Sequence, residues 1–326
     1  LAFFLKENIT SQILEKQEAI KDLSEKPEWR QEFTAVARLV KTETSSHLVL
    51  SWFREYKTFV PGHFKITSTI FSLISLAAII AYGTGYISGY HLFLWFLLGW
   101  LISGFYSKRV NALSDNVGKV QETFHQYYQL LTLIEKQEFS SEILKNKRDQ
   151  IITGSGKASV IFKKFSKAID ALEQRNNKLL GFLIIGFMLW DLRQSLKVEK
   201  WIIQNRDHVE NWFEIIEFFD AYNSLGNFSF NHDNYSYPEI TNGKYSIKAT
   251  QAAHPLLDPV KRIANDFEIE NEQFFIITGA NMAGKSTLIK AVGAAVFLAH
   301  MGMGVPATNM RLTLFDGLLS NINVID

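Results

Sequence analysis

The feature that most constrains the fold is a long stretch without charge. Residues 66–107 contain no Lys, Arg, Asp or Glu. A short loop at 83–89 divides this stretch into two apolar halves, at about 66–82 and 90–106. Each half, with a few flanking residues, reaches the roughly 17–25 residues that span the core of a bilayer. The pattern predicts a helical hairpin.

The charges around this hairpin predict its orientation. The connecting loop has no basic residue, whereas basic residues stand outside both ends, which is the positive-inside arrangement for a hairpin with both ends cytoplasmic. They are Arg54, Lys57 and Lys65 before it and Lys108 and Arg109 after it. We therefore predict a transmembrane hairpin at 66–107, with the lipid bilayer of the inner or plasma membrane as its partner. A buried hairpin in a soluble core and an apolar tip that docks on another protein are the alternatives.

The remainder of residues 1–225 has helical patterns. Ile13, Ile20 and Leu23 form one amphipathic stripe, and Pro27 marks a boundary after it. A third apolar run, 179–190, has only twelve residues, so a core helix is favoured over a membrane span. A local basic cluster is interpreted as a solvated face rather than a phosphate contact; it consists of Lys157, Lys163, Lys164 and Lys167.

Strand patterns begin near Gly226. Residues 228–230 and 245–249 alternate between apolar and polar, and 310–316 reads as another strand. The sequence therefore predicts a helical core and lever domain at 1–225 and a second domain, with strands, at 226–326.

The second domain contains the sequence TGANMAGKST at 278–287, which fits the phosphate-binding pattern G-x-x-x-x-G-K-[ST], or Walker A. Gly279 and Gly284 allow a turn tight enough for consecutive N–H groups to face a phosphate chain. Lys285 supplies a positive charge for the phosphates, and Ser286 offers a hydroxyl to Mg²⁺. Residues 274–277 are predicted to form a buried parallel strand, and 288–300 a helix whose N-terminus faces the anion. The motif predicts a nucleoside-triphosphate site.

Composition adds few constraints. The 326 residues allow two or three domains, and the 47% hydrophobic content is ample for their cores. The absence of cysteine excludes disulfides and Cys-based metal sites in this chain, and a net charge of +1 gives no argument for nucleic acid. The chain begins at Leu1 without a visible signal peptide. It ends at Asp326, soon after the phosphate loop, so we expect a piece truncated at its C-terminus.

The phosphate loop, with its Asn281-Met282 pair, resembles that of the MutS family of mismatch-repair ATPases. His254-Pro255 before the loop and the segment GVPA at 304–307 after it stand where the family has them. Residues 219–225 and 237–239 resemble the end of the family's lever helices. The resemblance covers 1–60 and 110–326, whereas the hairpin is foreign to the soluble repair proteins. It implies a membrane-associated branch with a helical core/lever domain followed by an incomplete P-loop α/β domain.

The resemblance also implies roles for single residues. Lys285 and Asn281 would act in catalysis, Ser286 would hold Mg²⁺, and Thr287 would approach the α-phosphate of ATP. The backbone that cradles the phosphates would come from Gly279, Ala280, Asn281, Met282, Ala283, Gly284 and Lys285. The family usually has Pro in place of Ala280, a change that affects loop stiffness more than chemistry.

The resemblance extends to two positions outside the loop. Arg262 or Ile263 stands where the family has an aromatic residue that stacks on adenine, so the Arg262 guanidinium could stack instead. His254 is expected to pack near the nucleotide. The acidic pair that positions Mg²⁺ and water, and the residues from a partner subunit, would lie beyond Asp326. The piece alone is therefore expected to bind nucleotide poorly and to be almost inactive.

Three functions remain open at this point. The first is a MutS-like ATPase in which ATP hydrolysis drives lever helices across a homodimer, with DNA as the distal ligand. The second is a transporter-type or membrane-remodelling ATPase without DNA binding. The third is a nucleotide-binding regulator without turnover.

Overall fold

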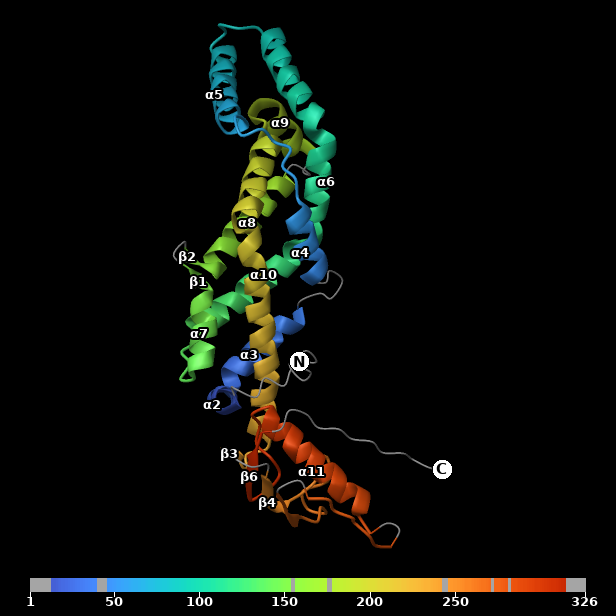
Figure 1. Ribbon diagram of the computed structural model, residues 1–326. Helices are drawn as coiled ribbons and strands as arrows, with labels where there is room; N and C mark the ends of the chain where they lie inside the picture. The colour runs from blue at the N-terminus through green and yellow to red at the C-terminus, as the bar shows by residue number, and fades with distance from the viewer. Residues whose placement is uncertain are drawn as a thin grey trace. The chain divides into compact units, whose positions relative to one another are not determined.

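The structure, a computed structural model, describes residues 13–39, 46–153, 156–174, 178–241, 246–270, 273–280 and 283–314. The chain divides into two compact units (Figure 1). The first unit comprises Leu1–Thr34, Gln137–Gln150 and Glu217–Asp326, and the second comprises Ala35–Lys136 and Ile151–Ile216.

The second unit is a helical assembly around an aromatic core. Its helices are α4 (Ser46–Glu55), α5 (Phe64–Gly83), α6 (Gly89–Lys136), α8 (Ala158–Glu173), α9 (Lys178–Met188) and the first part of α10 (Trp190–Asn231). Two short antiparallel strands, β1 (Ile152–Thr153) and β2 (Gly156–Lys157), precede α8. The rings of Phe165 and Trp201 stack with centroids 3.9 Å apart. The buried aromatic residues around them are Phe53, Phe124, Phe162, Trp212 and Phe213.

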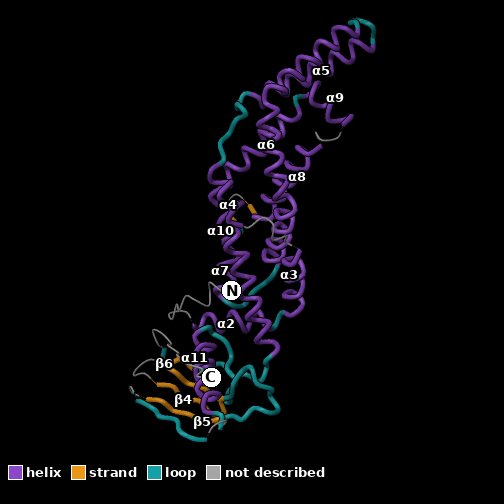
Figure 2. The backbone as a smooth tube through the Cα atoms, turned by 90° about the vertical axis from the view of Figure 1, so that its right-hand side faces the viewer, coloured by secondary structure: helices purple, strands orange, loops and turns teal. Residues whose placement is uncertain are grey.

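The predicted hairpin is present as α5 and the beginning of α6, which run side by side to a tight turn (Figures 1 and 2). Trp95 holds the two helices together, because its ring stacks on Phe71 at 4.5 Å and its Nε1 donates to Ser75 Oγ at 2.8 Å. Phe64, at the start of α5, meets Tyr106 at 5.4 Å. Within the described residues, two helical stretches are long and apolar enough to cross a membrane, Phe64–Gly83 and Gly89–Gly118.

The third apolar run forms α9, an eleven-residue helix that packs on α5 and α6. Backbones of α6 and α9 come very close, since a Cβ added to Gly99 would lie 2.0 Å from the Gly186 carbonyl oxygen. The prediction of a core helix was wrong in one respect, because Phe182 and Leu183 are about half exposed. The run is as apolar as a core helix, but only one of its faces finds a partner in this unit.

The helical part of the first unit contains α2 (Ile13–Ser24), α3 (Pro27–Leu39), α7 (Glu142–Gln150) and the end of α10. The predicted stripe of Ile13, Ile20 and Leu23 is buried. Pro27 is the first residue of α3, a position that its fixed φ and missing N–H suit. The sequence therefore located both the buried face of α2 and the boundary that follows it.

Asp22 joins α2 to the start of α7. Its buried carboxylate accepts hydrogen bonds from the backbone N–H groups of Ser140, at 2.7 Å, and Ser141, at 3.0 Å, and pairs with the Lys26 ammonium. Burial raises the pKa of Asp22, but the Lys26 ammonium and these hydrogen bonds outweigh it and leave the pKa below its ordinary value. Asp22 thus fixes the two residues that lead into α7 to another helix.

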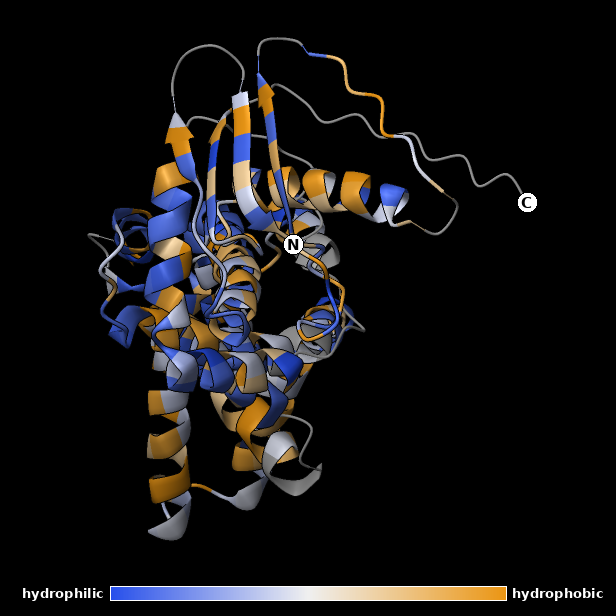
Figure 3. Ribbon diagram, turned by 90° about the horizontal axis from the view of Figure 1, so that it is seen from below, coloured by the Kyte–Doolittle hydropathy of each residue, from blue (hydrophilic) through white to orange (hydrophobic). Residues whose placement is uncertain are grey.

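The first unit also contains a mixed four-stranded sheet in the order β3-β6-β4-β5. Its strands are β3 (Glu239–Thr241), β4 (Ser246–Ala252), β5 (Asn265–Glu270) and β6 (Asn309–Thr313). β6 is parallel to β3 and antiparallel to β4, which is also antiparallel to β5. Helix α11 (Lys285–His300) lies beside the sheet (Figure 3) and buries Ala295, Val296 and Ala299 against it.

Three expectations about this unit need correction. Residues 274–277 were predicted to be a buried strand, but they have no strand pairing and all four side chains are 42–87% exposed. Figure 3 shows them as part of the hydrophobic trace between β5 and α11. A strand needs a neighbour to satisfy its N–H and C=O groups, and none of the described strands pairs with this segment. Its apolar composition could not reveal that.

The other two corrections concern alternating patterns. Residues 228–230 were predicted as a strand but belong to α10, and Phe228 stacks at 4.1 Å on His232, which follows the last residue of the helix. A three-residue alternation is too short to separate the two periods. The polar segment before the loop instead contains β5, which sequence analysis missed because its outer face is acidic.

Candidate functional site

The predicted phosphate loop turns directly into α11. Gly284 is the N-cap residue of that helix and has a left-handed backbone, with φ +84°. Its carbonyl accepts the Leu288 N–H at 2.9 Å, the first bond that anchors the helix. A residue with a Cβ rarely adopts such a conformation, which explains the glycine in the pattern. Asn281 and Met282, both predicted to be functional, lie outside the described residues.

Lys285 folds back over the loop. Its Nζ donates to the carbonyl oxygens of Gly279 and, at 2.8 Å, Ala280. The ammonium therefore lies against the inner edge of the turn, where it can exchange these acceptors for phosphate oxygens. Ser286 and Thr287 follow in the first turn of α11, and both are exposed.

The donors of this region fit a polyphosphate. The first N–H groups of a helix have no partner inside the helix, and those of Lys285, Ser286 and Thr287 have no acceptor among the described residues. The helix dipole adds partial positive charge at the same end. Three amides, one ammonium and the exposed Ser286 hydroxyl form a set of groups suited to a nucleotide phosphate chain with Mg²⁺.

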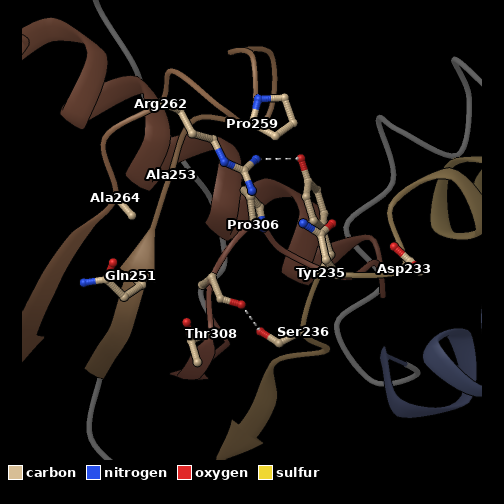
Figure 4. Close-up of a pocket in the computed structure, with 12 residues that line it drawn as sticks. Asp233, Tyr235, Ser236, Gln251, Ala253, Pro259, Arg262, Ala264, Pro306 and Thr308 are labelled. Carbon is tan, nitrogen blue, oxygen red and sulfur yellow. Dashed lines mark hydrogen bonds between the residues drawn. The ribbon is translucent and has the colours of Figure 1, made fainter.

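A separate cavity of about 450 Å³ lies between the sheet and the segments before and after it (Figure 4). Arg262 reaches into it, with its guanidinium 5.6 Å from the Tyr235 ring centroid and its Nη1 3.4 Å from the Tyr235 hydroxyl. Pro306 and Gln251 also line the cavity. None of the described residues of the phosphate loop lines it.

The structure therefore does not bring all the predicted site residues together. Arg262 has an aromatic partner of its own, Tyr235, whereas the neighbouring Ile263 is 82% exposed. His254 bonds locally, since its Nδ1 accepts the Leu256 N–H at 3.2 Å. The nucleotide roles of Arg262 and His254 stay predictions. Tyr235 was given no role from the sequence, because no spacing pointed to its place beside Arg262.

The segment after α11, residues 304–307, is hydrogen-bonded to Ser236, before β3, and to Ala253, after β4. Val305 exchanges two backbone hydrogen bonds with Ser236, of 2.8 and 3.1 Å, and the Pro306 carbonyl accepts the Ala253 N–H at 2.8 Å. The Ser236 hydroxyl donates to the Ala307 carbonyl at 2.7 Å. The segment is buried, so its small and apolar residues are explained by packing between α11, the segment before β3 and the end of β4.

Comparison with known proteins assigns the loop to a family. The model of MutS domain V matches residues 275–326. The DNA mismatch repair protein MutS of Syntrophomonas wolfei subsp. wolfei is 30% identical over 164 residues, 48% of this chain and 19% of the relative. The protein of the same name in Salinibacter ruber is 26% identical over 234 residues, 69% of this chain and 22% of the relative.

A fungal relative shares a shorter segment. The DNA mismatch repair protein msh-2 of Neurospora crassa is 40% identical over 82 residues, which are 24% of this chain and 9% of the relative. The chain spans about a fifth of the length of the bacterial relatives. The family model covers the phosphate loop, the whole of α11 and β6. The relatives described here are all DNA mismatch repair proteins by name, so over the matched segments the chain is similar to the MutS family.

Proposed function

We propose that this protein is a membrane-anchored ATPase of the MutS family that binds ATP and Mg²⁺ at the start of α11. The observation that carries the proposal is the local geometry of the loop. Gly284 has the left-handed conformation that opens the turn, and Lys285 lies over the turn. Three neighbouring amides have no acceptor among the described residues and can bind an anion. This geometry falls inside the segment that matches MutS domain V.

The residues of the loop would divide the work of holding ATP. Lys285 would leave the two loop carbonyls for the β- and γ-phosphates, and Thr287 would contact the α-phosphate. Ser286 would ligate Mg²⁺, which neutralises charge on the phosphate oxygens during hydrolysis. Asn281, adjacent to the described part of the loop, would face the γ-phosphate. ATP hydrolysis would also need an acidic pair that positions Mg²⁺ and water, and residues from a second subunit, as the family resemblance implies.

The relatives suggest what ATP turnover serves. They are named DNA mismatch repair proteins, and we propose that a homodimer of this protein binds DNA and couples it to nucleotide state. Helix α10 would act as the lever. It is continuous for 42 residues, about 63 Å at 1.5 Å per residue. It ends at Asn231, shortly before β3 starts at Glu239, so movement of the sheet can be passed to it.

The hairpin of α5 and α6 would anchor this engine in a membrane. Only 22% of the most apolar window of α5 and 11% of that of α6 is buried inside the protein. A core helix of a soluble protein would be mostly buried. Large apolar side chains on both helices are exposed, among them Leu73, Ile80, Leu101 and Phe105. A bilayer would cover this surface.

ATPase measurements on the full-length protein test the nucleotide part. Lys285→Ala should abolish measurable turnover, whereas Lys290→Ala should retain it, since Lys290 is exposed on the same helix beyond its first turn. Equal turnover in both variants and the wild type would remove the enzyme assignment. For DNA, duplexes with and without a mismatch are compared at one fixed salt concentration. Failure to bind either duplex at low salt would exclude DNA as the ligand.

The absence of cysteine makes the membrane part testable by labelling. Single cysteines are introduced as Ser88→Cys, in the loop of the hairpin, and Thr58→Cys, before α5. With both hairpin ends cytoplasmic, an impermeant maleimide added outside intact cells should label position 88 and leave position 58 unlabelled. Labelling of neither site until the cells are lysed, together with release of the protein by carbonate, would refute the anchor.

A further inference from the structure

A second cavity, of about 460 Å³, lies at the foot of the hairpin, within the second unit. The first turns of α5 and α10 form its walls. Four of its lining side chains are cations: Lys65, Arg193, Lys197 and Lys200. The last three follow one another at helical spacing on one face of α10. Lys65 is one of the charges that flank the hairpin, whereas the sequence alone indicated no role for the other three.

These four charges have no acidic partner in the described part of the chain. The nearest acid in sequence, Glu199, is buried and directed elsewhere: it accepts the N–H groups of Phe59, at 2.8 Å, and Val60, at 3.2 Å, and the Tyr56 hydroxyl. Burial, and then the charge of Arg193, lower the pKa of Lys197. Such crowding favours an anionic ligand.

The level of the cavity along the hairpin is fixed by two contacts. Phe64 meets Tyr106 across the hairpin, and Ser103 Oγ donates to the buried Asp191 carboxylate at 2.8 Å. The beginnings of α5 and α10 therefore lie level with the end of the charge-free stretch of α6. Lys108 and Arg109 follow at that level, so the cavity opens where the apolar surface of the hairpin ends.

The rest of the lining is apolar. Ile66 and Ile70 of α5 and Leu196 of α10 share the cavity with the cations. Both isoleucines are at least half exposed and continue the apolar surface of α5. A site for free phosphate gains nothing from such a wall. A ligand with a phosphate at one end and a hydrocarbon chain at the other matches both parts of the lining.

We propose that this cavity binds the phosphate headgroup of an anionic phospholipid, with the first part of an acyl chain along Ile66 and Ile70. The proposal rests on the proposed insertion of the hairpin in a membrane. It adds a preference among lipids, which insertion by apolar area alone does not supply.

The test measures lipid binding to the full chain in a neutral detergent. Three ligands are titrated separately while the thermal midpoint of unfolding is followed: dihexanoyl phosphatidylglycerol, dihexanoyl phosphatidylcholine and inorganic phosphate. The foot variant removes four positive charges; its substitutions are K65Q, R193Q, K197Q and K200Q. The control variant removes the same charge from the basic cluster around α8; its substitutions are K157Q, K163Q, K164Q and K167Q. Far-ultraviolet circular dichroism verifies that both variants are folded.

Wild type and control should bind phosphatidylglycerol roughly tenfold more tightly than phosphatidylcholine. The foot variant should bind the two lipids within about twofold of each other. Equal binding of both lipids by wild type would overturn the site, as would equal loss in the control variant, which would indicate bulk charge. A shift with inorganic phosphate as large as that with phosphatidylglycerol would assign the cavity to free phosphate.

Carbonate extraction of membranes that contain the wild type and the foot variant separates this proposal from the anchor on which it rests. Retention of both proteins, with equal lipid affinities, leaves the anchor intact and refutes the headgroup site. Release of both proteins refutes the anchor itself, whatever the lipid titration shows. Retention of both, with lipid selectivity only in wild type and control, is the expected result.

Discussion

Replacement of Gly284 tests whether its left-handed backbone is what allows the loop to hold a phosphate chain. The residue has φ +84°, and a Cβ added there would meet no heavy atom within 4 Å. A substitution therefore acts on the backbone and not through a clash. For a residue with a Cβ, this conformation costs about 1–2 kcal/mol relative to glycine. Because the loop is exposed, the variant can relax to another conformation and must regain the strained one to bind.

The cost should appear in the dissociation constant of ATP. An energy of about 1–2 kcal/mol corresponds to roughly 5–30-fold weaker binding for Gly284→Ala. Gly284→Asn should lose less, since Asn enters the left-handed region more readily, and the β-branched Gly284→Val should lose most. A fluorescent ATP analogue is titrated into the full-length variants, with the thermal midpoint as a check of folding. Binding within twofold of wild type for all three, or equal loss for Asn and Val, would refute the reasoning.

Two further predictions concern the stability of the first unit. Asp22→Asn should lower the free energy of unfolding by about 2–4 kcal/mol, because the start of α7 loses a buried, charged acceptor. As a control, Asp149→Asn, at an exposed position, should change the free energy of unfolding by less than about 0.5 kcal/mol. Folding lowers the pKa of Asp22, so the carboxylate stabilises the fold at pH values above its unfolded pKa of about 3.9, and this stabilisation is lost as the pH falls through the folded pKa. The difference in free energy of unfolding between wild type and Asp22→Asn, measured with urea, should therefore be smaller at pH 3 than at pH 7. An equal difference at both pH values would contradict the assignment. Gly302→Ala should lower the free energy of unfolding by about 2–5 kcal/mol, because Gly302 has φ +74° and an added Cβ would lie 2.7 Å from Lys16 Cβ. Gly62→Ala is the control, since an added Cβ there would meet open space. Equal thermal midpoints for the two variants would contradict the packing around Gly302.

The parts of the fold that sequence predicted well are those that local chemistry decides. The hairpin was predicted from two charge-free stretches, each about as long as a membrane-spanning helix. These two stretches agree with α5 and the apolar part of α6. The helix after the phosphate loop follows in the same way, because a glycine at its N-cap and an apolar run are sufficient to start it. Pro27 marks the start of α3 for a comparable reason.

The failures concern partners far away in sequence. The apolar run 274–277 has the composition of a buried strand, but burial depends on neighbouring strands, and composition cannot say whether they pair with it. The family resemblance suggested that Arg262 or Ile263 replaces an aromatic residue that stacks on adenine, but it did not predict that the Arg262 guanidinium lies beside the Tyr235 ring. In both cases the sequence indicates the chemistry of a residue but not which residues surround it in the fold.

The division of the first unit into three chain segments has a consequence for synthesis. Asn223 donates to the Arg30 carbonyl, and Gln17 donates to that of Pro238, across 193 and 221 residues. A ribosome adds about 5–20 residues per second, so Gln17 and Arg30 wait roughly 10–40 s for these partners. During that interval the hairpin emerges from the ribosome, and residues 35–136 can form their own local contacts. Helices α2 and α3 are therefore made well before their partners and are among the last segments to reach their final neighbours.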